Sequence, residues 1–170
     1  MKLPTLEPQS SPIQEGLGDP YLRLQLEEKV PIAIPMETAR EVLVVPVEQI
    51  TPIPNMHDCV LGLLNQRSRV FWVIDLSSML GYSGFTTTAR QFNVVILQVD
   101  EVPLGLAVPT VQGVTRFSTD LIQSPIGAVA PNIAPYLRGC LPEEQEILLV
   151  LDPDAIVHAS VLQRNLRGLF

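Results

Sequence analysis

The sequence predicts a mainly β fold built from two similar small units. Proline accounts for 16 of the 170 residues and glycine for 10, which breaks the chain too often for long helices. Several short segments alternate between apolar and polar residues, the period of a half-buried strand. Hydrophobic residues make up 46% of the chain and charged residues 17%, so a packed core is expected and extended disorder is not.

The strands are expected to begin near residue 21. There Leu22, Leu24 and Leu26 alternate with Arg23 and Gln25, which places the leucines on one face. Further strands are expected at residues 30–34, 41–45 and 70–74, and Trp72 in the last of these should be buried. We expect residues 20–168 to form a single domain, preceded by a flexible leader rich in proline and serine at residues 1–19.

Two stretches of the chain are repeated. Residues 30–35 follow an acidic turn and are echoed by residues 102–109, which follow another. The interval from Gly62 to Asp75 equals that from Gly139 to Asp152. Each unit is too small to be stable alone, so we expect the two units to bury a shared apolar face.

Helices are expected to be few and short. Asp75 and Asp152 each precede a short helical pattern, and an aspartate at that position caps the first backbone N–H groups. Pro153 suits the first position of the second helix. This terminal helix is expected to cover one end of a barrel and to fray near Gly168.

Charge and composition exclude several classes of partner. Eleven Lys and Arg against 18 Asp and Glu give a net charge of -7, so no nucleic acid or anionic membrane surface is expected to bind. No signal peptide or membrane-spanning stretch is visible, which favours a cytoplasmic protein without direct membrane insertion. Cys59 and Cys140 provide neither a disulfide framework nor a metal cluster.

Catalytic motifs are weak in this sequence. A base, a carboxylate and a thiol are adjacent at His57, Asp58 and Cys59, but neighbouring side chains on a turn point in different directions. No phosphate loop, nucleophile elbow or metalloprotease motif is present, so we expect a binding module without enzyme activity, cofactor or metal. Two alternatives remain: a β domain that senses a small ligand in the cleft between the units, and a thiol-dependent enzyme that uses Cys59 or Cys140.

The order of these segments resembles the CheW domain, a family of chemotaxis coupling proteins. The resemblance is carried by residues 60–67 (VLGLLNQR), 73–76 (VIDL), 105–108 (GLAV), 113–114 (GV) and 148–152 (LLVLD). It implies two small SH3-like β-barrels packed side by side. It also implies a non-catalytic adaptor that couples the cytoplasmic tip of methyl-accepting chemoreceptors, in membrane-bound arrays, to the regulatory domain of a CheA-type histidine kinase.

The resemblance also assigns candidate contact residues. Glu41 and Arg67 match receptor-facing positions, and Ile50 and Ile53 match the kinase-facing side. From the residues alone, Arg67 could instead brace its own loop, and the two isoleucines could be ordinary core residues.

Two departures from the family pattern indicate a divergent member. Ser68 replaces a turn glycine and Pro109 replaces an acid. A paralogue that serves type IV pilus motility in place of flagellar chemotaxis is compatible with these departures, and both outputs stay open.

Overall fold

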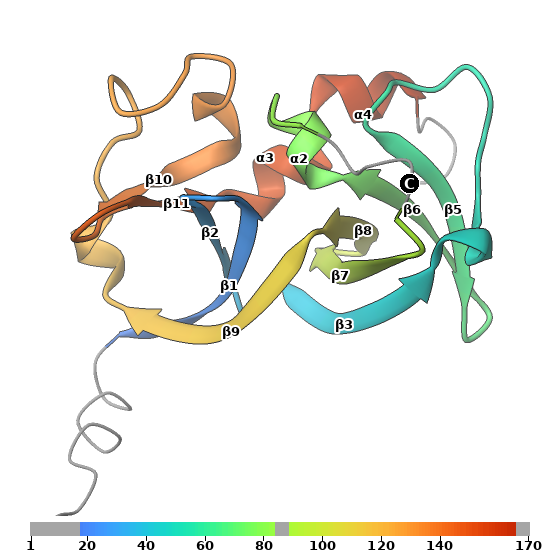
Figure 1. Cartoon of the computed structure of the whole chain (residues 1–170), viewed down its shortest axis with the longest axis horizontal. Coiled ribbons are helices and arrows are strands. Elements are labelled where there is room, and N and C mark those ends of the chain that lie inside the picture. The colour runs from blue at the N-terminus through green and yellow to red at the C-terminus, as the bar shows by residue number, and fades with distance from the viewer. Residues whose placement is uncertain (1–17, 84–88, 166–170) are drawn as a thin grey trace, which may run out of the picture.

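Two curled β-sheets lie side by side, with short helices above the line where they meet (Figure 1). The computed structural model describes residues 18–83 and 89–165. Residues 1–17 of the expected leader, and the expected fraying end near Gly168, lie outside these ranges. The two sheets confirm the mainly β fold and the paired barrels.

We call the six-stranded sheet barrel 1 and the five-stranded sheet barrel 2. In order across the sheet, barrel 1 consists of β3 (Ala39–Pro46), β7 (Gln91–Val99), β8 (Val102–Val108), β6 (Arg69–Asp75), β5 (Val60–Gln66) and β4 (Ile50–Thr51). Barrel 2 consists of β10 (Leu137–Pro142), β11 (Ile147–Leu151), β2 (Val30–Pro35), β1 (Asp19–Glu27) and β9 (Thr110–Phe117). The α-helices are α2 (Leu76–Met79), α3 (Pro153–Val157) and α4 (Ser160–Asn165), and the 3-10 turns are η1 (Val47–Gln49), η2 (Thr119–Leu121) and η3 (Ala134–Tyr136).

The sequence repeats do not coincide with the barrels. The first repeat places its β1–β2 hairpin in barrel 2 and its strands β3 to β6 in barrel 1. The second repeat places its β7–β8 hairpin in barrel 1 and its later strands in barrel 2. The connections that leave the two hairpins are short, residues 36–38 and the single residue Pro109. Because proline has no N–H and a fixed φ, the strand cannot continue its pairing there, and the chain crosses to the other barrel.

The seam between the barrels contains the largest apolar cluster. Leu22, Leu24 and Leu26 all point into it, as their alternation predicts. Trp72 lies in the same cluster and is 6% exposed, which confirms its predicted burial. Each barrel also has a smaller interior of its own, and in barrel 2 the rings of Tyr21 and Phe117 stack with centroids 4.0 Å apart. Since each barrel takes strands from both repeats, we infer that the two halves fold together.

The predicted helix caps are present. Ser78 N donates to Asp75 Oδ1 and Ala155 N donates to Asp152 Oδ1, each over 3.2 Å. The terminal helix differs from the expectation because it is broken at His158 into α3 and α4. Both pieces contribute side chains to the seam cluster, and in Figure 1 α3 lies near the seam while α4 lies above strands β5 and β6 of barrel 1. Among the described residues, no helix is long and apolar enough to cross a membrane.

Candidate partner-binding surfaces

The turn between β5 and β6 has a strained backbone. Gln66 pairs with Arg69, which leaves Arg67 and Ser68 as a two-residue loop. Their φ angles are 51° and 65°, the left-handed values of a type I′ turn. The turn therefore has the conformation that glycine favours, although neither position carries a glycine.

Glycine at position 68 is expected to stabilise the fold. A left-handed φ costs a residue with a Cβ roughly 1 kcal/mol, so Ser68→Gly should raise the free energy of unfolding by about 1 kcal/mol. Urea unfolding followed by Trp72 fluorescence measures the change. Ser118→Gly is the matched control, because Ser118 has a φ of -74° and its side chain accepts a hydrogen bond from Asp120 N. The control should lower the free energy of unfolding. If both substitutions changed the free energy of unfolding in the same direction, the inferred backbone strain at Ser68 would be contradicted.

Two of the predicted contact residues lie together. Arg67 Nη1 lies 3.6 Å from Glu41 Oε1, and the Arg67 side chain is 76% exposed while that of Glu41 is 39% exposed. In the pairing of β3 with β7, the register shifts between Ala39 and Glu41, so Glu41 lies directly after an irregularity in the strand. An ion pair this exposed contributes little to stability, so both charges remain accessible to a partner.

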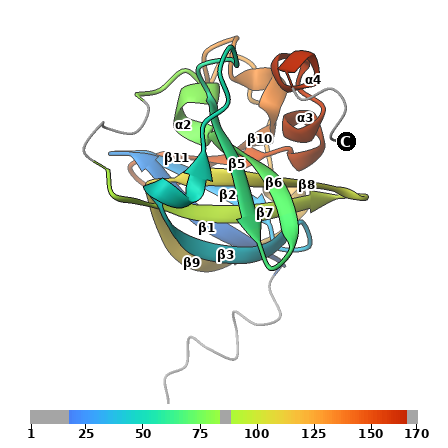
Figure 2. The ribbon, with the colours of Figure 1, turned by 90° about the vertical axis from the view of Figure 1, so that its right-hand side faces the viewer.

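An apolar strip lies on the two strands at the lower side of the seam. Val42, Val44 and Val114, which we call the valine strip, are 44%, 60% and 60% exposed. Val42 is paired with Val95 and Val114 with Leu22, both members of the seam cluster. Side chains of directly paired residues share a face, so the strip continues the apolar face of the seam into solvent. Strands β3 and β9, which carry it, lie next to each other in both views (Figures 1 and 2).

The valine strip was not among the contact residues predicted from the sequence. A signal was present, because residues 42–45 are apolar at every position and not at alternate positions. A strand with one solvent-facing side needs apolar residues only at alternate positions, so the additional valines indicate a second contact surface.

The two isoleucines assigned to the kinase-facing side differ in burial. Ile50 is 7% exposed in the interior of barrel 1, because β4 pairs it with the fully buried Leu64. Ile50 is therefore a core residue, which is one of the two alternatives that the sequence left open. Ile53 is half-buried between the exposed prolines Pro52 and Pro54, and only its position is compatible with a surface contact.

His57 and Cys59 are in contact, although neighbouring side chains on a turn were expected to point apart. His57 Nδ1 is 3.2 Å from Cys59 Sγ, and the backbone N–H of Cys59 donates to the same Nδ1. Cys59 is nevertheless fully buried, and burial raises the pKa of its thiol to about 11. Cys140 is 3% exposed. A catalytic thiolate needs a lowered pKa and access, and neither cysteine combines the two.

Both thiols are expected to be unreactive in the folded protein. With a pKa near 11, roughly one Cys59 in a thousand is a thiolate at pH 8. An aromatic disulfide reagent at pH 8 should therefore label neither cysteine within minutes, and should label both in urea. Rapid labelling of Cys59 without urea would support the thiol-enzyme alternative.

A paired-barrel fold that carries an exposed ion pair and an exposed apolar strip on opposite faces of one strand has the surface features of a protein-binding module. Within residues 18–83 and 89–165, no group of three or more metal-ligating side chains comes together. Residues 20–161 match the family model of the CheW-like domain, and the chain belongs to this family.

Individual relatives agree with the family assignment. Chemotaxis protein CheW of Thermotoga maritima is 24% identical over 123 residues, which cover 72% of this chain and 79% of the relative. Protein PilI of Pseudomonas aeruginosa is 29% identical over 122 residues, covering 72% of this chain and 66% of the relative. The crystal structure of the scaffolding protein TtCheW from Thermoanaerobacter tengcongensis has the same fold, with a TM-score of 0.68 at 20% identity over 80% of this chain and 90% of that one.

Proposed function

We propose that this chain is a non-catalytic adaptor that couples the cytoplasmic tip of a methyl-accepting chemoreceptor to the regulatory domain of a CheA-type histidine kinase. Its output is chemotaxis or pilus-based motility. Family membership over residues 20–161 supports this function, and the similarity to PilI supports the pilus pathway. The adaptor acts in the cytoplasm and is recruited to receptor arrays at the membrane.

We assign the receptor contact to the Glu41–Arg67 pair and the valine strip, which lie on the two faces of the edge strand β3 and of its neighbour β9. The strip offers apolar area that a partner can desolvate, and the charged pair, with its atoms 3.6 Å apart, can orient a partner that reaches around the edge of β3. A receptor helix with an apolar face and flanking polar residues has the matching chemistry. The exposure of both features along the edge strand β3 is the observation that carries this assignment.

We assign the kinase contact to the surface around Ile53 in barrel 1. The segment leaves β4 through two exposed prolines, which stiffen it and reduce the entropy lost on binding. Ile50 precedes this segment and packs in the barrel interior, whereas Ile53 packs against the seam cluster. The kinase contact follows β4, whereas the receptor contact lies on β3, β9 and the β5–β6 turn, so both partners can bind at once.

Charge-removing variants test the assignment of the two surfaces. Immobilised receptor tip and immobilised kinase regulatory domain are each incubated with wild type, Glu41→Ala and Arg67→Ala. Both variants should lose receptor affinity, by less than 1 kcal/mol if the pair stays solvated and by about 2 to 5 kcal/mol if it is desolvated in the complex. Kinase binding should be unchanged.

Arg138→Ala is the matched control, because Arg138 is an exposed arginine of barrel 2. It changes the net charge as Arg67→Ala does, and it should leave both partners bound. If Glu41→Ala and Arg67→Ala retained the receptor and lost the kinase, the assignment of the two surfaces would be wrong.

A further inference from the structure

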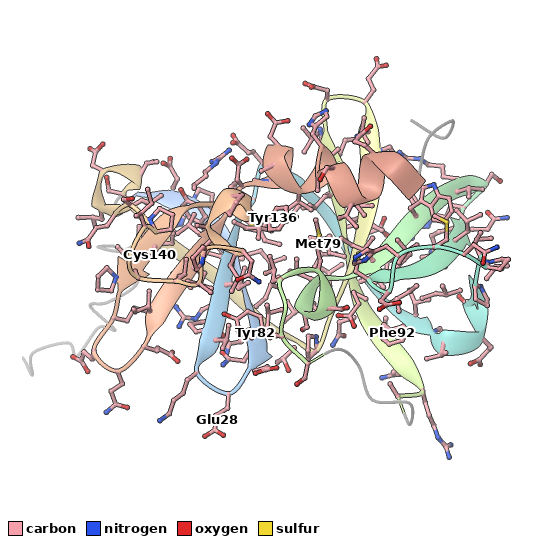
Figure 3. The ribbon with its side chains drawn as sticks, turned by 90° about the horizontal axis from the view of Figure 1, so that it is seen from above. Glu28, Met79, Tyr82, Phe92, Tyr136 and Cys140 are labelled. Carbon is pink, nitrogen blue, oxygen red and sulfur yellow. The ribbon has the colours of Figure 1, made fainter. Side chains whose placement is uncertain are left out.

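A cleft opens on the α2 side of the molecule, where the two repeats meet. It has a volume of about 610 Å³ and lies between the end of α2, the β1–β2 turn, the loop of residues 128–133 and the β10–β11 turn. Figure 3 looks down on this side and shows Tyr82, which lines the cleft, beside the β1–β2 turn that carries Glu28. The valine strip lies on β3 and β9 at the opposite side of the molecule (Figure 1).

The floor of this cleft is apolar and belongs to the core. Leu80, Ile133 and Leu149 line it and are 0%, 6% and 4% exposed, and all three are members of the seam cluster. Ile147 at its edge is 40% exposed. An apolar side chain entering the cleft would therefore contact side chains fixed by the core, which is the setting of an interface hot spot.

The rim of the cleft is acidic. A second hollow of about 400 Å³ adjoins it, since both are lined by Lys29, Gln145 and Glu146. Glu143 and Glu144 also line this second hollow. The β1–β2 turn adds Glu27 and Glu28, so glutamates of two turns outnumber the nearby cations.

Part of this charge is already fixed within the molecule. Arg23 donates to Glu143 through two nitrogens, over 3.0 and 2.8 Å, and to Glu146 over 3.2 Å. This clamp holds the β10–β11 turn against β1. The exposed Glu28 and Glu144 have no ionic partner among the described residues, so their charge is available to a ligand.

We propose that this cleft binds an extended basic segment of a partner protein, with one apolar side chain in the cleft and a following Lys or Arg in the acidic hollow. Charge complementarity selects this occupant: the floor excludes a wholly polar ligand, and the rim repels an acidic one. The site does not depend on the proposed receptor and kinase contacts. Because it faces away from the valine strip, a third partner can bind while a receptor occupies the strip.

A peptide titration tests the proposal. The probe is a short peptide with a central leucine flanked by lysines, added to the nitrogen-15-labelled full chain. Saturable shifts are expected for the backbone amides that line the cleft, including those of Gly81 and Ile147. Replacing the leucine of the peptide by glycine, or its lysines by glutamates, should each weaken binding at least about five-fold.

Matched variants of the protein locate the site. Glu144→Lys on the exposed turn and Ile147→Asn at the cleft edge should each weaken binding at least about five-fold. Glu48→Lys changes the same charge on η1 of barrel 1 and should have less than about a two-fold effect. Thermal unfolding followed by Trp72 fluorescence confirms that each variant is folded.

Other outcomes would overturn the proposal. Equal weakening by Glu144→Lys and Glu48→Lys would show that the basic peptide is attracted by the net negative charge of the protein and does not bind at the cleft. Equal binding of an uncharged amphiphile would make the cleft a small-molecule site. Shifts of the cleft amides on raising the protein concentration alone would make a second copy the occupant. The same shifts on deletion of residues 1–17 would assign the cleft to the chain's own leader.

Discussion

Replacement of Gly62 by alanine is expected to destabilise the fold by at least about 3 kcal/mol. Gly62 has a φ of 143°, and a Cβ built on it would lie 2.1 Å from Thr51 O, the backbone of the neighbouring strand β4. The substitution would therefore push apart the strands that close barrel 1. Urea unfolding monitored by Trp72 fluorescence measures the loss, and a loss below about 1 kcal/mol would contradict this packing.

Substitutions at two other glycines distinguish the cost of a steric clash with the backbone from the cost of a positive φ. Gly113→Ala combines a φ of 119° with open space, so it should cost only the backbone strain, about 1 to 2 kcal/mol. Gly139 is the counterpart of Gly62 in barrel 2, and a Cβ there would lie 2.2 Å from Gln123 O. Gly139→Ala should therefore resemble Gly62→Ala. If instead it resembled Gly113→Ala, the equivalence of the two barrels at this position would be refuted.

Aspartate at Val44 is expected to abolish receptor binding without unfolding the chain. Val44 is 60% exposed, so the charge stays solvated in the free protein and the free energy of unfolding should change by less than about 0.5 kcal/mol. In the complex the charge would be buried and unpaired, which costs at least about 2 kcal/mol and weakens binding about 30-fold or more. Calorimetric titration with the receptor tip measures this loss.

The control for this prediction is Leu121→Asp. Leu121 is 56% exposed on η2 of barrel 2, away from the valine strip. It introduces the same charge at a comparable exposure and should leave receptor affinity unchanged. Kinase affinity should be unchanged in both variants. If Val44→Asp alone lost kinase binding, the valine strip would be a contact for the kinase and not for the receptor.

Local features of the fold were predictable because they depend on neighbouring residues. The alternation of Leu22, Leu24 and Leu26 placed one face of β1 in the core, and Asp75 and Asp152 capped their helices. These signals lie within single strands and turns, where spacing alone determines which side chains share a face.

Features that depend on distant contacts were not predictable. The exchange of hairpins between barrels pairs β1 with β9, which lies far along the chain, and no local pattern encodes that pairing. The burial of Ile50 follows from the pairing of β4 with β5. Strand β4 has only two residues, which is too short to show an alternation of apolar and polar residues. The proximity of Glu41 and Arg67 was expected only through the resemblance to the CheW family, since nothing in the spacing of the two residues requires it.

A bridging measurement tests the proposed coupling most directly. Receptor tip is immobilised, and the kinase regulatory domain is added with and without this chain. The account predicts that the kinase is retained on the receptor only when the chain is present, and that Val44→Asp removes this retention while the variant still binds free kinase. Equal retention of kinase without the chain, or binding of the chain to only one of the two partners, would contradict the role of coupling adaptor.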